Sequence, residues 1–121
     1  MANIPFPELQ DTLSAAAQIV APDKELTFRA MFGGAGVYVE GIIMATLSNV
    51  GIGLKLSPPD QEQLLKLDGA KRLQHDESMP PSKQYIQPPK AFESNPDEIA
   101  HWVKRSIDFV MTLPIPKKKL K

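Results

Sequence analysis

The sequence predicts an α+β domain: an antiparallel β-meander with flanking N- and C-terminal helices. Three observations predict this class. Near both ends of the chain, apolar residues recur every three or four positions, which is the period of a helix. Between residues 26 and 56, apolar residues alternate with polar ones or form short runs, as they do in strands. Short turn sequences separate these blocks, so consecutive strands are expected to pair.

The first helix is predicted over residues 6–21. Pro5 and Pro7 stand at its start, where a missing amide costs little, and Pro22 ends it. A single apolar stripe follows from the spacing of Leu9, Leu13, Ala16 and Val20.

The meander is predicted from the pattern of residues 26–56. Gly33–Gly36 is interpreted as a turn whose glycines supply positive φ angles, Glu40-Gly41 as a tight hairpin, and Ser48–Gly51 as a third turn. The four strands, expected to be adjacent in chain order, are Leu26–Phe32, Val37–Val39, Ile42–Leu47 and Ile52–Leu56.

Two helix starts have clear capping signals. Ser57 precedes two prolines and an acid, which predicts a helix to about Leu67. Asn95, followed by proline and two acids, predicts a last helix that ends at Leu113-Pro114, with Trp102 on its core-facing side. Between the two helices, short edge strands are expected at Arg72–His75 and Lys83–Gln87.

Length and composition indicate one domain, residues 1–116, with a basic tail at 117–121. The chain has 121 residues, no cysteine and no apolar run long enough to span a membrane, so we expect a cytoplasmic protein without membrane contact. Removing the four tail lysines from the 14 basic residues leaves 10 against 14 acidic ones, a net charge of −4. Direct nucleic acid binding is therefore not expected.

Known catalytic and metal-binding patterns are missing from the sequence. The glycine-rich segment leads into a strand, whereas a phosphate-binding loop leads into a helix, so a structural turn is the main interpretation. His75, Asp76 and Glu77 fall in a polar loop, and His101 falls on the polar side of its helix. We expect no metal, no cofactor and no catalytic residue.

Arg29 is the most notable single residue, because it is a charged side chain in the middle of a predicted strand. Its expected role is an ion pair with Glu40 or another acid on the same face. The alternative is an anion or partner site, for which the candidate binding residues are Arg29, Phe32, Gly33, Gly34 and Gly36.

Three blocks of sequence resemble the N-terminal domain of the TfoX/Sxy family. They are RAMFGGAGVYVEG at 29–41, IGLKL at 52–56 and IAHWVKRSIDFVMTLP at 99–114. The resemblance implies a meander with flanking helices, similar to YjbR-like and secretion-chaperone-like domains. It also implies a role related to competence regulators, which promote transcription of DNA-uptake genes, and it supplies no catalytic residues to transfer.

The sequence thus favours a non-enzymatic regulatory or protein-interaction domain with a protein partner, and it is compatible with a homodimer. The alternative is a small-ligand or anion-binding domain, or an uncharacterised enzyme, that uses Arg29 and the glycine turn. A concave pocket that converges on Arg29 would favour the alternative. An exposed flat apolar patch or a dimer face would favour the first hypothesis.

Overall fold

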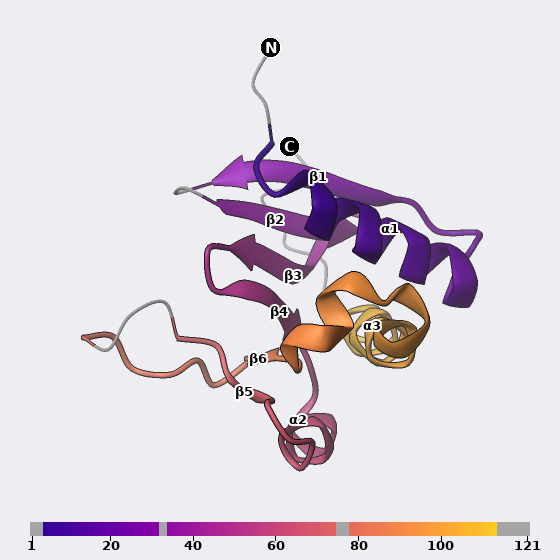
Figure 1. Cartoon of the computed structure of the whole chain (residues 1–121). Helices are drawn as coiled ribbons and strands as arrows, with labels where there is room; N and C mark the ends of the chain where they lie inside the picture. The colour runs from indigo at the N-terminus through magenta and orange to yellow at the C-terminus, as the bar shows by residue number, and fades with distance from the viewer. Residues whose placement is uncertain (1–3, 32–33, 75–77, 114–121) are drawn as a thin grey trace.

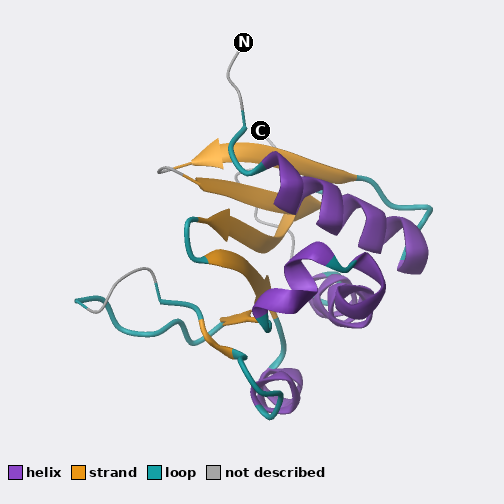
Figure 2. Cartoon of the chain, in the orientation of Figure 1, coloured by secondary structure: helices purple, strands orange, loops and turns teal. Residues whose placement is uncertain are grey.

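In the residues that it describes, 4–31, 34–74 and 78–113, the computed structural model contains a six-stranded antiparallel sheet and three α-helices (Figure 1). The N- and C-terminal helices lie on one face of the sheet, and the short middle helix lies at one end of it (Figure 2). None of the described helices is long and apolar enough to cross a membrane. The predicted α+β class is confirmed. The elements are α1 (Pro7–Val20), β1 (Leu26–Met31), β2 (Gly34–Val39), β3 (Ile42–Ser48), β4 (Gly51–Lys55), α2 (Pro58–Leu65), β5 (Lys71–Arg72), β6 (Tyr85–Gln87), the 3₁₀ helix η1 (Lys90–Ser94) and α3 (Pro96–Val110).

The strands are arranged in the order β1-β2-β3-β4-β6-β5, and each neighbouring pair is antiparallel. The predicted adjacency of the first four strands is therefore confirmed. The two later strands also form, but they are shorter than predicted, and His75 lies outside the described residues. The expectation that both would be edge strands is wrong for β6, which pairs with β4 as well as β5. Pro88 follows β6 and therefore does not interrupt its hydrogen bonds.

The hairpin between β2 and β3 has the backbone that its sequence predicts. Glu40 and Gly41 both have positive φ angles, 52° and 83°. Two consecutive residues with positive φ form the turn whose twist matches that of the paired strands.

A β-bulge in β3 determines how the sheet meets α3. The pairing of β2 with β3 shifts between Val37 and Tyr38, so that Met44 is an extra residue on the β3 side. The Met44 side chain is fully buried, and its carbonyl accepts a hydrogen bond of 2.8 Å from the Ser106 hydroxyl of α3. The bulge thus presents a buried backbone acceptor, and the helix satisfies it.

The hydrophobic core lies between the sheet and the pair α1 and α3, with α2 at the β6 end. Trp102 of α3 is only 8% exposed, which confirms its predicted place in the core. The largest fully buried side chains are Leu13, Met44, Leu47, Ile52, Leu54, Leu56, Leu64, Ile86, Ile99, Ile107, Val37 and Val39.

Both predicted helix caps are present. The Ser57 side chain accepts a hydrogen bond from the backbone amide of Asp60 at 3.5 Å, and the Asn95 side chain accepts one from Glu98 at 3.4 Å. In each helix a proline occupies the first turn, as expected.

Glu93 of η1 ties three distant parts of the chain together. Its carboxylate accepts a hydrogen bond of 2.9 Å from the amide of Ile52 in β4, and its backbone carbonyl accepts one of 2.7 Å from Thr12 of α1. Gly51 makes this approach possible, because a Cβ at that position would lie 2.0 Å from the Glu93 carboxylate. The sequence does not predict this contact, since 41 residues separate the two partners.

Replacing Trp102 with alanine should destabilise the fold by about 3–5 kcal/mol, because it removes a buried aromatic side chain and leaves a cavity. The free energy of unfolding in urea would measure the loss. Met79→Ala is the control, since Met79 is 48% exposed and its truncation should change stability by less than about 0.5 kcal/mol. Equal effects of the two substitutions would contradict the core position of Trp102.

Candidate functional site

Of the five residues predicted to form a binding site, the structure describes three. Arg29 lies in β1, and Gly34 and Gly36 lie in β2. Phe32 and Gly33 lie outside the described residues. Arg29 and Gly36 are direct partners in the β1–β2 register, so the structure does bring these two together.

Arg29 does not form the ion pair with Glu40 that we expected. Within the described chain its contact is with Tyr38: the guanidinium carbon lies 5.2 Å from the centre of the ring. The register explains the difference. Arg29 is opposite Gly36, four residues along β2 from Glu40 in the turn, and a separation of four strand residues is about 13 Å.

Gly34 and Gly36 are strand residues, so the prediction that they form a turn with positive φ is wrong. Gly34 is required for a different reason, the close approach of a neighbouring backbone. A Cβ on Gly34 would lie 2.2 Å from the carbonyl oxygen of Leu47 in β3. The glycine therefore serves the packing of the sheet.

The face of the sheet opposite the helices, called the helix-free face below, carries Arg29 and Tyr38. Val37, Ala45, Leu54 and Ile86 form one cross-strand row and are buried in the core, and side chains alternate between the two faces along each strand. On the opposite face, Thr27 pairs with Tyr38 and Tyr38 pairs with Ile43. Further along the sheet, Lys55 pairs with Tyr85 on the same face. Within the described residues, no helix covers this face (Figure 2).

Charge in the described strands is of one sign. Their only charged residues are Arg29, Lys55, Lys71 and Arg72. Arg72 donates a hydrogen bond to Gln61 of α2 at 2.9 Å and so lies on the helix side. By alternation the other three cations belong to the helix-free face. All 14 carboxylates of the chain lie outside the six described strands, so the sheet is basic although the chain is neutral.

Tyr85 of the helix-free face has a shifted pKa. Burial raises the pKa of the Tyr85 phenol above its ordinary value of 10.0, and the charge of the nearby Tyr38 raises it further. Sequence reasoning did not single out Tyr38, Tyr85 or Lys55. The signal was the alternation in their strands, which places Tyr38 and Lys55 on the side opposite Val37 and Leu54.

Two buried polar atoms of the described residues have no hydrogen-bond partner: the Thr46 hydroxyl and the Gln87 side-chain carbonyl. Thr46 pairs with Gly36 on one side and Gly53 on the other. Leu73 packs over Gly53 on the same face, where a Cβ would lie 2.9 Å from the leucine. In the middle of the helix-free face, the Thr46 hydroxyl therefore lies between two glycines, Gly36 and Gly53.

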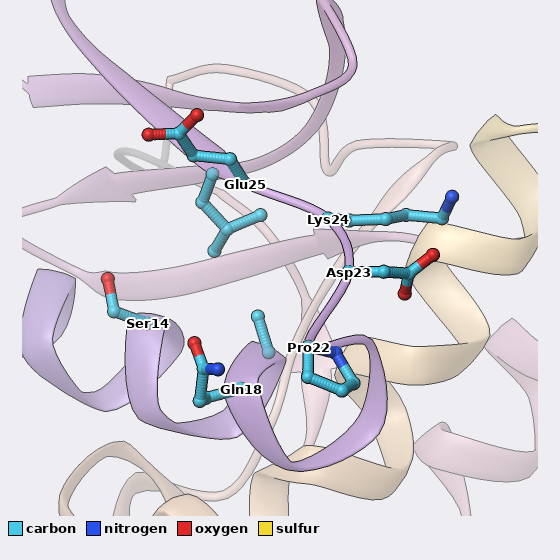
Figure 3. Close-up of a pocket in the computed structure, with 8 residues that line it drawn as sticks. Ser14, Gln18, Pro22, Asp23, Lys24 and Glu25 are labelled. Atoms are coloured by element: carbon cyan, nitrogen blue, oxygen red, sulfur yellow. The ribbon is translucent and has the colours of Figure 1, made fainter.

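Three hollows in the described structure lie away from Arg29 and the glycines. The first, about 340 Å³, lies between α1 and residues 22–26; in Figure 3 the charged groups of Asp23, Lys24 and Glu25 do not converge on one point. The second, about 320 Å³, lies beside the 2.6 Å ion pair of Arg105 with Asp60. The third, about 500 Å³, lies beside Glu93, whose carboxylate is held by Ile52.

Histidine and carboxylate side chains form no metal-binding cluster within the described residues. His75, Asp76 and Glu77 lie outside those residues, as does the basic tail at 117–121. His101 is exposed on α3, as predicted, and its Nε2 accepts a hydrogen bond of 3.0 Å from Arg105.

Comparison with known proteins places the sequence in a family. The family model for the TfoX N-terminal domain matches residues 18–110. No curated protein matches the chain, and no solved structure matches it.

Gly34→Ala should destabilise the protein by about 1–3 kcal/mol, because the new methyl group would overlap the Leu47 carbonyl and the strands would have to separate. Chemical denaturation measures the loss. A variant with unchanged stability would show that β2 and β3 can move apart freely at this position.

The raised pKa of Tyr85 predicts a loss of stability at alkaline pH. The folded state keeps the Tyr85 proton to a higher pH than the unfolded state does. The resulting stabilisation is complete below pH 10 and disappears as the pH rises through the folded pKa. The free energy of unfolding should therefore fall more steeply above pH 10 in the wild type than in Tyr85→Phe. Parallel curves for the two proteins would contradict the burial of this phenol.

Proposed function

The chain belongs to the TfoX N-terminal domain family, and we propose that it is a non-enzymatic regulatory domain that binds another protein through the helix-free face. The partner surface is acidic. The observation that carries this proposal is the segregation of charge: Arg29, Lys55 and Lys71 are the charged residues on this face of the described sheet. Its similarity to competence regulators suggests that the binding serves the control of transcription.

The spacing of the cations favours a protein over a nucleic acid. Arg29 and Lys71 lie on β1 and β5, at the two ends of the strand order, so five strand spacings separate them, about 24 Å. That distance matches the width of a protein interface of about 800 Å² per partner. A nucleic acid site instead concentrates cations along one stripe.

The uncharged residues of the face suit the same kind of partner. Tyr38, Ile43, Thr46 and Tyr85 are each half-buried and lie among the cations. Tyrosine is enriched at protein interfaces because it offers a large apolar ring together with a hydroxyl that can form hydrogen bonds. None of the three hollows described above is lined by Arg29, Gly34 or Gly36.

The proposal is tested by reversing charge on one face at a time. Lys55→Glu with Lys71→Glu changes the helix-free face, and Lys66→Glu with Lys104→Glu makes the same net change on exposed positions of the helix side. Each protein is used to capture partners from its native cells, and the captured protein is then purified and titrated against each variant. We expect at least about a tenfold loss of affinity for the first variant only, and weaker binding at high salt.

Two results would overturn the proposal. One is a partner that is lost with the helix-side variant and retained with the sheet variant. The other is capture that nuclease treatment abolishes, since the ligand would then be a nucleic acid.

A further inference from the structure

No described strand pairs with the outer edge of β1. Within the residues that the structure describes, β1 is six residues long and pairs with β2 alone, without a register shift. It contains no proline, whereas the opposite edge of the sheet is the two-residue strand β5. A long, regular edge strand is ready to pair with another strand, and proteins usually shorten, kink or cover such edges.

Antiparallel pairing of β1 with a second copy is possible in only a few registers. The outward N–H and C=O groups belong to alternate residues, so directly opposed residues must be both even or both odd in number. The pair is then related by a two-fold axis through one residue of the strand. The choices near the middle of β1 are Thr27, Phe28 and Arg29.

Charge complementarity selects Thr27. A two-fold axis there places Arg29 of each copy opposite Glu25 of the other, and Leu26 opposite Phe28. An axis through Arg29 would oppose the two arginines, and one through Phe28 would oppose Arg29 to Thr27 without an ion pair. Opposed residues in a sheet have their Cβ atoms about 5 Å apart, so oppositely charged pairs stabilise the pairing and like charges weaken it.

The exposed groups at this edge are placed for such contacts. Glu25 and Arg29 are both exposed, and Figure 3 shows Glu25 directed away from Ser14 and Gln18 of α1. The contact of Arg29 with Tyr38 does not prevent an ion pair, since an exposed cation–π contact is weak.

Apolar groups at the edge would also be covered. Leu26 and Phe28 are half-buried and lie on the helix side of the strand. Leu26 lines the hollow of about 340 Å³ between α1 and residues 22–26. In the selected register, Phe28 of the second copy lies opposite Leu26 and therefore next to this hollow.

We propose that the protein forms a two-fold dimer in which the β1 strands pair in antiparallel fashion about Thr27. The two six-stranded sheets then form one continuous sheet, with all helices on one side. This inference goes beyond the proposed function, because it concerns the protein without its partner.

A charge exchange tests the ion pairs. Glu25→Arg and Arg29→Glu each place like charges opposite one another twice per dimer, and the double variant restores both pairs in reverse. Sedimentation equilibrium should show a dimer for the wild type, at least about tenfold weaker association for each single variant, and recovery in the double variant. Lys104→Glu, at an exposed position of α3, should dimerise normally. A monomeric wild type, or a double variant no better than the singles, would overturn the proposal.

The register is tested separately by disulfide crosslinking. The chain has no cysteine of its own, so any disulfide must form through the introduced residue. Thr27→Cys should form a disulfide-linked dimer on mild oxidation, since each Thr27 opposes its own copy, and Arg29→Cys should not. Crosslinking of Arg29→Cys alone would overturn the register. Both experiments use purified protein without a partner, so their failure leaves the binding experiment of the previous subsection unaffected, and the reverse also holds.

Discussion

The hydrogen bond from Ser106 to the Met44 carbonyl is the contact on which the arrangement of the helices depends. The bulge in β3 leaves a backbone acceptor inside the core, and a buried carbonyl without a partner costs about 1–3 kcal/mol. Only a donor that arrives from the helix side can satisfy it. The position of Ser106 on α3 therefore fixes both the rotation of the helix and its height along the sheet.

The other helices take their places from α3. Leu13, Ala16 and Ala17 of α1 are buried in the core that α3 shares, and small residues allow the two helices to approach closely. Arg105 of α3 reaches Asp60 of α2 at 2.6 Å. A partly exposed ion pair adds little energy, so its contribution is orientation. Because the helices pack on one side of the sheet, the apolar side chains of the strands are buried on that side. The polar and aromatic side chains of the strands lie on the helix-free face.

What could be predicted from the sequence has local physical causes. The Ser57 and Asn95 caps act within four residues, and the Glu40-Gly41 turn needs only its own backbone angles. Gly34 was misinterpreted because the group that requires it, the Leu47 carbonyl, belongs to another strand. The Arg29 partner was misassigned for a related reason. Residues that share a face by alternation contact each other only if the register brings them together, and the register of β1 on β2 is a property of the pair.

The positive charge of Arg29 bears both on the pairing of β1 edges and on partner binding at the helix-free face. Arg29 lies on both: it belongs to the helix-free face and stands in β1, the edge strand of the sheet. Paired copies would bring two basic faces into one surface, and an acidic partner with two matching sites would bind both at a high effective concentration. In that assembly the ion pairs with Glu25 would neutralise the two arginines, leaving Lys55 and Lys71 of each copy to attract the partner. Dimerisation at the edge and partner binding on the face therefore use the same guanidinium in different contacts. In the single chain this guanidinium lies 5.2 Å from the ring of Tyr38, which belongs to the helix-free face and pairs with β1.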